Sequence, residues 1–182
     1  MNKNKVAFLD RDGVINEDFG YVHLWQNFEF CDGVIDGMIN LINLDFKLII
    51  ITNQSGIDRG LFSEYQYLKM TNLMLNHLKK FGVEITDIFY CPHHPNFSKR
   101  SFANCNCRKP KPGLFIKAIK KYNININESI SIGDSERDLI ASKLAGIKKR
   151  YLISSKKFLI KNDYATETFK SLLECSQFLQ KK

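Results

Sequence analysis

The chain has 182 residues, of which 44% are hydrophobic and 25% charged, a composition typical of one water-soluble globular domain. No apolar run approaches the roughly 20 residues that a membrane helix needs, and the start is too short and acidic for a signal peptide, so we expect a cytoplasmic protein without membrane contact. The net charge of +8 suits a protein that binds nucleic acid or an enzyme that acts on phosphorylated small molecules. Because the lysines are spread along the chain, we expect them to form a solvated surface, and we expect no nucleic-acid partner.

Five segments of strand length alternate with helical patterns along the chain. The first, second and fourth are nearly all apolar before they end in a polar residue, which is typical of parallel strands buried on both faces. The predicted strands are Val6–Leu9, Leu48–Thr52, Ile85–Tyr90, Ser129–Ile132 and Tyr151–Ser154.

Apolar residues at helical spacing fill the segments between these strands. The predicted helical faces lie in residues 35–42, 70–81, 115–122 and, as a final helix, Thr168–Leu179. Ser63 with Gln66 indicates a capping box, Pro112 suits a first helical turn, and Gly146 suits the end of a helix that begins near Ser135. This alternation predicts an α/β fold with a doubly wound parallel sheet, as a single domain over residues 1–182.

Polar residues follow three of the predicted strands, at the edge where ligands bind in doubly wound sheets. They are Asp10 and Asp12 after the first strand, residues 52–55 after the second, and residues 134–138 after the fourth. One aspartate in such a place is usually a turn or helix cap, but several carboxylates in one crevice are unfavourable unless they share a cation. Oxygen ligands of this kind suit Mg²⁺, which also accepts substrate phosphate oxygens, so the sequence predicts a magnesium site.

Four motifs, in this order along the chain, resemble those of the haloacid dehalogenase-like phosphatase superfamily. They are Asp-x-Asp-Gly-Val, an apolar strand ending in Thr, Lys-Pro, and Gly-Asp-x-x-x-Asp. The resemblance implies a Rossmann-like sheet, with Asp10 as the nucleophile and Asp12 as the general acid/base. It further implies that Thr52 and Lys109 hold the phosphoryl oxygens. Asp10, Asp134 and the main-chain carbonyl of Asp12 would hold Mg²⁺.

Elementary chemistry supports these roles. A carboxylate nucleophile splits hydrolysis into two displacements through an aspartyl-phosphate, and the charge of the transferred group calls for Mg²⁺ and Lys109. Asp12 lies close enough to the nucleophile to protonate the leaving oxygen and then deprotonate the incoming water. We expect Asp138 to orient the metal ligand or Lys109, and Glu136 and Arg137 to be exposed residues in the first turn of a helix.

Residues 91–111 show little periodicity, and a loop of this length is usually functional or held by a ligand. Four soft ligands in it would form a closed tetrahedral zinc site: Cys91, His93, Cys105 and Cys107. His94 competes with His93 for the nitrogen position, and free thiols with an exposed histidine are the alternative to any metal. We predict a structural Zn²⁺ that sets the positions of Arg108 and Lys109, which directly follow the last cysteine.

Six longer stretches make the sequence look more like D-glycero-D-manno-heptose 1,7-bisphosphate phosphatases than like histidinol-phosphate phosphatases. They are DRDGVIN (10–16), GYVH (20–23), NFEFCDGVID (27–36), TNQSGIDRG (52–60), CPHHP (91–95) and CRKPKPG (107–113). The resemblance implies removal of the C7 phosphate from a heptose bisphosphate, on the route to ADP-heptose and lipopolysaccharide.

The same resemblance implies a set of substrate contacts. The residues concerned are Asp18, Phe19, Gly20, Tyr21, Thr52, Asn53, Gln54, Ser55, Arg108 and Lys109, with Arg59 as a further candidate. Where the family typically has a lysine that contacts substrate, this chain has Ser135, which carries no charge. Lys111 is a candidate for replacing that charge.

Several alternatives stay open. The substrate could be histidinol phosphate or another small sugar phosphate, and the charge of +8 suggests a polynucleotide 3′-phosphatase, although no basic groove with interleaved aromatic residues is visible. A zinc-stabilised binding module without catalysis is opposed by the complete set of acidic and phosphate-binding residues. The insert after the first strand and the zinc loop, at roughly 20 residues each, are too short for a separate cap domain. With no coiled-coil pattern, a monomer is the default expectation.

Overall fold

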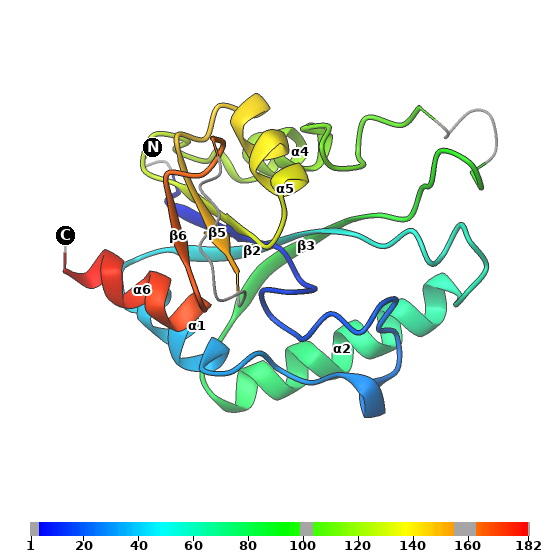
Figure 1. Ribbon diagram of the computed structural model, residues 1–182. Coiled ribbons are helices and arrows are strands. Elements are labelled where there is room, and N and C mark those ends of the chain that lie inside the picture. Colours follow the sequence, from blue (N-terminus) through cyan, green and yellow to red (C-terminus); the bar gives the residue numbers. More distant parts are fainter. Residues whose placement is uncertain (1–3, 99–103, 155–162, 182) are drawn as a thin grey trace.

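The computed structural model describes residues 4–98, 104–154 and 163–181, and a sheet of six parallel strands forms its centre (Figure 1). In spatial order the strands are β3 (Ile85–Cys91), β2 (Lys47–Asn53), β1 (Val6–Leu9), β4 (Ile130–Gly133), β5 (Lys149–Ile153) and β6 (Glu167–Phe169). The five strands predicted from the sequence are all present: β1 has the predicted bounds, and the ends of the other four differ by at most two residues.

The central strands pack on both faces, as their continuous apolar sequences require. All four residues of β1 are buried, and β2 is buried from Leu48 to Thr52. Neighbouring residues point to opposite faces: Leu9 belongs to one apolar cluster and Phe8 to the other. Each face therefore needs its own layer of helices.

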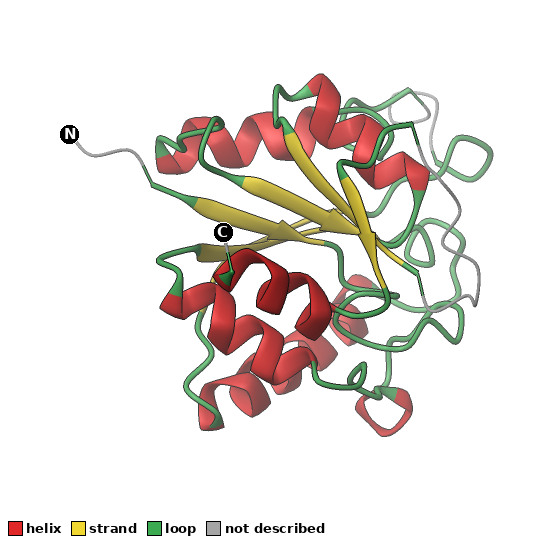
Figure 2. Ribbon diagram, turned by 60° about the vertical axis from the view of Figure 1, so that its left-hand side comes forward, coloured by secondary structure: helices red, strands yellow, loops and turns green. Residues whose placement is uncertain are grey.

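Helices cover both faces of the sheet (Figure 2). One layer contains α1 (Val34–Asn43), α2 (Glu64–Lys80) and α6 (Leu172–Gln180), and the other contains α4 (Gly113–Tyr122) and α5 (Glu136–Leu144). The doubly wound α/β fold is thus confirmed. None of the helices in the described part of the chain is long and apolar enough to cross a membrane.

Local helix signals also act as the sequence indicates. Ser63 Oγ accepts a hydrogen bond from Gln66 N at 3.2 Å, while Gln66 Oε1 accepts one from Ser63 N at 2.8 Å, which confirms the capping box. Between β1 and α1 the chain forms a single 3₁₀ turn, Trp25–Asn27. No cap domain stands over the sheet within the residues that the structure describes.

The predicted start of the final helix is wrong. Residues 167–169 form β6, which pairs with β5 in the register Tyr151 to Glu167 and Ile153 to Phe169. The helix begins only after Ser171, whose hydroxyl accepts a hydrogen bond from Glu174 N at 3.2 Å. Phe169 is buried in the core, so its packing overrides the helical spacing that its sequence neighbours suggest.

The direction of winding reverses between β1 and β4. From β1 the chain adds β2 and β3 on one side, and it then returns to add β4, β5 and β6 on the other. Ligands bind outside the carboxyl ends of the strands at such a switch point. The polar segments after β1, β2 and β4 meet at this edge.

Candidate active site

Asp10 directly follows β1 and is tied to a buried lysine. Its Oδ1 accepts a hydrogen bond from Arg11 N at 2.7 Å, and its Oδ2 lies 2.9 Å from Lys109 Nζ. Lys109 Nζ also donates to the carbonyl of Ile51 at 2.7 Å and lies 2.6 Å from Asp138 Oδ1. One buried ammonium thus joins the ends of β1 and β2 to the start of α5.

Asp12 is held by three neighbouring side chains. Nη2 of Arg11 lies 2.7 and 2.9 Å from its two carboxylate oxygens, and the amides of Asn16 and Gln54 each donate to it at 3.0 Å. The Gln54 amide also donates to Thr52 Oγ1 at 3.0 Å. The orientation of Asp12 is therefore fixed, although its side chain remains 21% exposed and can reach a bound molecule.

Asp134 follows β4 and packs against Gly13. A Cβ on Gly13 would lie 2.4 Å from Asp134 Oδ2, and Gly13 has a φ of +78°, so both space and backbone conformation require glycine. Asp134 Oδ1 is buried and has no hydrogen-bond partner among the described residues. In the next turn, Asp138 accepts hydrogen bonds from the main-chain N–H and hydroxyl of Ser135 and so caps α5.

Three carboxylates gather at this edge of the sheet, and two of them contact the same ammonium. Oxygens of Asp10, Asp134 and Asp138 lie within 4.8 Å of one another, and with Lys109 they leave a formal charge of 1 − 3 = −2. Burial raises the pKa of Asp10 above its usual value despite the opposing charge of Lys109. Burial and the Asp138 carboxylate raise the pKa of Asp134 to about 7. A bound divalent cation would neutralise this excess.

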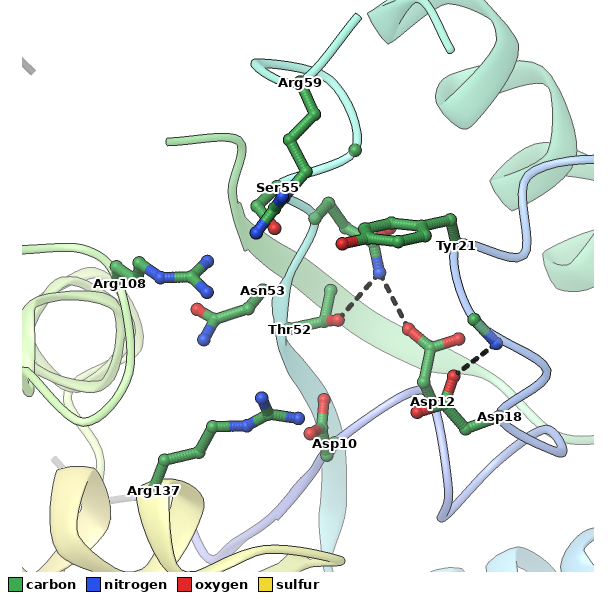
Figure 3. A pocket seen from close by; sticks show the side chains of 13 residues that line it. Asp10, Asp12, Asp18, Tyr21, Thr52, Asn53, Ser55, Arg59, Arg108 and Arg137 are labelled. Atoms are coloured by element: carbon green, nitrogen blue, oxygen red, sulfur yellow. Dashed lines mark hydrogen bonds between the residues drawn. The ribbon is translucent and has the colours of Figure 1, made fainter. Parts of the chain in front are cut away.

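A cavity of about 290 Å³ opens at Asp10 (Figure 3). Of the residues predicted to act on or contact substrate, it is lined by Asp10, Asp12, Asp18, Gly20, Tyr21, Thr52, Asn53, Gln54, Ser55, Arg59 and Arg108. The side chain of Asn53 is fixed by two hydrogen bonds with the main chain of Lys109, at 3.0 and 3.1 Å. The structure therefore gathers most of the predicted contacts around one space.

Three predicted residues lie elsewhere. Lys109 is buried next to Asp10 without lining the cavity, Phe19 is 62% exposed outside its lining, and the Ser135 hydroxyl is engaged with Asp138. Conversely, Arg137 lines the cavity, although the sequence analysis treated it only as an exposed helix residue. No short-range signal in the sequence pointed to this residue, because an arginine in the first turn of a helix is usually solvated.

The predicted zinc ligands come together in space. The ligand atoms of Cys91, His93, Cys105 and Cys107 lie within 4.8 Å of one another, and Sγ of Cys91 is 3.7 Å from that of Cys105 and 2.9 Å from that of Cys107. Zinc–sulfur bonds of about 2.3 Å in a tetrahedron would separate two sulfurs by about 3.8 Å. Burial opposes ionisation of Cys105, yet hydrogen bonds with Cys107 and His93 lower its pKa to about 7. Burial raises the pKa of Cys91 and of Cys107, so the spacing of the four ligand atoms, rather than their charge state, is what suits a metal.

His94, the competing nitrogen ligand, is directed away from this cluster. Its Nε2 lies 2.6 Å from Arg59 Nη2, and its main-chain N–H donates to Asp58 at 3.0 Å. His93 instead places Nδ1 3.2 Å from Cys107 Sγ, and its carbonyl accepts a hydrogen bond from Arg108 Nη1 at 3.2 Å. The cluster thus holds one of the arginines that line the cavity.

Comparison with known proteins agrees with this geometry. Residues 5–167 match a family model described as polynucleotide kinase 3 phosphatase. A D-glycero-alpha-D-manno-heptose-1,7-bisphosphate 7-phosphatase from Photorhabdus laumondii is 46% identical over 155 residues, 85% of each chain. A D-glycero-beta-D-manno-heptose-1,7-bisphosphate 7-phosphatase from Pasteurella multocida is 45% identical over 153 residues, 84% of this chain and 83% of that one. This chain belongs to the heptose-bisphosphate phosphatase family.

Solved structures of similar proteins share the fold of this chain over nearly its whole length. The crystal structure of D,D-heptose 1,7-bisphosphate phosphatase from B. bronchiseptica, complexed with magnesium and phosphate, superposes with a TM-score of 0.85. The two chains are 30% identical, and the match covers 98% of this chain and 99% of that one. A HAD-like phosphatase from Mesorhizobium loti is 25% identical, with a TM-score of 0.83 over 97% of this chain and 88% of the other.

Proposed function

We propose that this chain is a Mg²⁺-dependent phosphatase that removes the C7 phosphate of D-glycero-D-manno-heptose 1,7-bisphosphate. The position of Asp10 carries the proposal, because it places a carboxylate in a cavity beside the buried ammonium of Lys109. Relatives that are 45 to 46% identical and named as 7-phosphatases of this bisphosphate support the choice of substrate.

The reaction proceeds in two displacements. A carboxylate oxygen of Asp10 attacks phosphorus, forming an aspartyl-phosphate, and the C7 oxygen of the sugar leaves with a proton from Asp12. Asp12 then takes a proton from the water that hydrolyses the aspartyl-phosphate. Lys109 and Thr52 hold the phosphoryl oxygens, and the Gln54 amide, which donates to both Thr52 and Asp12, keeps these two groups in register.

The residues around Asp10 fit a magnesium ion. Asp10, Asp134 and the main-chain carbonyl of Asp12 would hold it, and the buried, unpartnered Oδ1 of Asp134 supports this assignment. A bound Mg²⁺ supplies positive charge to phosphoryl oxygens and keeps the neighbouring carboxylates ionised. Asp138 is a positioning residue, because its Oδ1 lies 2.6 Å from Lys109 Nζ and its Oδ2 accepts a hydrogen bond from Ser135 N.

The cysteine and histidine cluster fits a structural zinc ion. Four protein ligands complete a tetrahedron, which leaves no position for a reacting water. The ligands would be Cys91, His93, Cys105 and Cys107. Zinc here would hold the loop that carries Arg108 to the cavity and Lys109 to Asp10, since the described part of that loop buries few apolar side chains of its own.

Phosphate release against a panel of substrates tests the function. The panel holds both anomers of heptose 1,7-bisphosphate, histidinol phosphate, fructose 1,6-bisphosphate and a 3′-phosphorylated oligonucleotide, which the name of the matching family model makes a necessary competitor. We expect a preference of about tenfold or more in kcat/KM, about 1.4 kcal/mol, for a heptose anomer. A preference for the oligonucleotide or for histidinol phosphate would reject the proposed substrate.

Substitution of the nucleophile tests the chemistry. Asp10→Asn should abolish turnover and leave the fold intact, because the amide is isosteric but cannot form the acyl phosphate. Asp36→Asn, on α1 and outside the cavity lining, is the matched control and should keep full activity. Retained turnover in Asp10→Asn would exclude Asp10 as the nucleophile.

A further inference from the structure

Arg137 occupies an unusual position for an exposed arginine. It lies in the first turn of α5, where the positive end of the helix dipole disfavours a cation. No described residue forms a hydrogen bond or ion pair with its guanidinium, yet the side chain lines the cavity that contains Asp10. Figure 3 shows it extending from α5 toward Asp10. Such a group is available to a ligand.

Two further arginines reach the same cavity from different elements. Arg59 comes from the loop after β2, and Arg108 comes from the loop before α4 (Figure 3). Arg108 is partly buried, and Arg137 and Arg59 lie close enough for their charges to act on it. Arg59 Nε is buried without a hydrogen-bond partner among the described residues. The cavity thus gathers three guanidinium groups. Arg59 also contacts His94, and Arg108 donates to the carbonyl of His93, whereas Arg137 has no hydrogen bond or ion pair with a described residue.

The carboxylates that line the cavity form no ion pair with these arginines in the described part of the chain, although the charge of Arg137 also acts on Asp134 and Asp138. Asp12 is paired with Arg11, and Asp10 faces Lys109. Asp18 Oδ1 accepts a hydrogen bond from Gly20 N at 3.0 Å. A phosphoryl group undergoing transfer beside Asp10 would be held by Lys109 and Thr52, so the arginines remain for another anion.

We propose that Arg137 acts together with Arg108 to bind a second phosphate of the substrate, so that this enzyme selects sugar bisphosphates over sugar monophosphates. The proposal rests on the proposed function and adds a residue that determines specificity. Guanidinium groups suit this role because they present several N–H donors in a plane to phosphate oxygens. The positive end of the α5 dipole attracts the negative charge of the bound phosphate, and this phosphate would offset the repulsion between the helix end and Arg137.

A pair of substrates that share the reacting phosphate tests the proposal. We would measure kcat and KM for heptose 1,7-bisphosphate and heptose 7-phosphate with the wild type, Arg137→Gln and Arg137→Lys. Arg137→Gln should raise KM for the bisphosphate roughly tenfold, the effect of one charge-assisted hydrogen bond near solvent, with little change in kcat. The monophosphate lacks the second group, so its kcat/KM should change less than about twofold. Arg137→Lys should restore part of the loss.

Lys143→Gln is the matched control, because it removes a positive charge from the last turn of the same helix, outside the cavity. It should leave both substrates unchanged. An equal loss on both substrates in Arg137→Gln would overturn the proposal, since Arg137 would then act on the transferred phosphate or on Asp134 and Asp138. No change on either substrate would overturn it as well.

The outcome can be separated from failure of the proposed function. If the panel shows another sugar bisphosphate as substrate, the same comparison is made with that compound and its monophosphate. A phosphatase that hydrolyses only monophosphates would reject the role of Arg137 and leave the phosphatase chemistry standing. If no compound is hydrolysed, calorimetry of fructose 1,6-bisphosphate binding to wild type and Arg137→Gln decides, and a difference under about twofold overturns the proposal.

Discussion

Lys109 is the buried cation that contacts both Asp10 and Asp138, and we expect its replacement by methionine to lower both stability and catalysis. Its Nζ contacts Asp10, Asp138 and the carbonyl of Ile51 at 2.9, 2.6 and 2.7 Å, in a side chain that is 1% exposed. Removal of one partner from a buried ion pair costs about 3–5 kcal/mol, because the remaining charge is left buried and unpaired. Since Asp10 has a raised pKa and can take up a proton, we expect the lower end of this range.

The assay is urea unfolding of the Lys109→Met variant in magnesium-free buffer without chelator, followed by phosphate release with Mg²⁺. Lys120→Met, on the exposed side of α4, is the matched control and should change the free energy of unfolding by less than about 0.5 kcal/mol. Catalysis should fall roughly 10²- to 10³-fold in kcat, as for loss of one group that stabilises the charge of the transition state.

A double mutant shows whether the loss comes from the unpaired carboxylates. Asp138→Asn removes one of them and keeps an oxygen to accept from Ser135 N. In the Lys109→Met background it should therefore cost less than it does in the wild type, with a coupling of at least about 1 kcal/mol. Additive losses, or a loss under about 1 kcal/mol in Lys109→Met alone, would refute this explanation.

Three further predictions concern the metals and their surroundings. The pKa of Asp134 is about 7 in the folded protein, against an ordinary value of 3.8. Between about pH 4 and pH 7 the metal-free folded state therefore binds more protons than the unfolded state. Its free energy of unfolding should fall as the pH rises through this interval. Mg²⁺ should accordingly raise Tm more at pH 8 than at pH 5.5, and an equal gain at both would contradict the raised pKa. Cys107→Ser should lower zinc content by elemental analysis and Tm by scanning calorimetry, whereas Cys31→Ser, outside the cluster, should keep the zinc. Gly13→Ala and Gly82→Ala both place a side chain at positive φ, which costs about 1 kcal/mol of stability in each case. Only the Cβ at position 13 would meet Asp134. Gly13→Ala alone should therefore raise the Mg²⁺ concentration that gives half-maximal activity.

The central sheet could be predicted because its signals are strong and local. β1 and β2 are continuous apolar runs that end in polar residues, and only burial on both faces accounts for such runs in a chain of this composition. The arrival of Asp10, Thr52 and Asp134 at one edge follows from the parallel topology alone. The Cys91 to Cys107 cluster could likewise be predicted, because soft ligands in one loop have few other uses in a protein without disulfides.

The remaining features depend on contacts between distant residues. Glu167–Phe169 pairs with β5 and buries Phe169, which no short-range pattern reveals. Ser135 occupies a position where the family typically has a lysine, and only the structure shows that its hydroxyl is engaged by Asp138. Arg137 was missed because first-turn arginines are usually solvated, and only the cavity distinguishes this one.

The loop from β3 to α4 contains both the Cys/His cluster and the buried Lys109, and the second depends on the first for its position. Lys109 must be buried against two carboxylates, which demands that its backbone be fixed to within a fraction of an ångström. In the described part of this loop, little hydrophobic packing is available to do so. Cys107 anchors the chain two residues earlier, and Asn53 fixes the Lys109 main chain from β2 at 3.0 and 3.1 Å. The Cys/His cluster and the Asn53 amide thus take the place of a local core, and they position the buried ammonium of Lys109 beside Asp10.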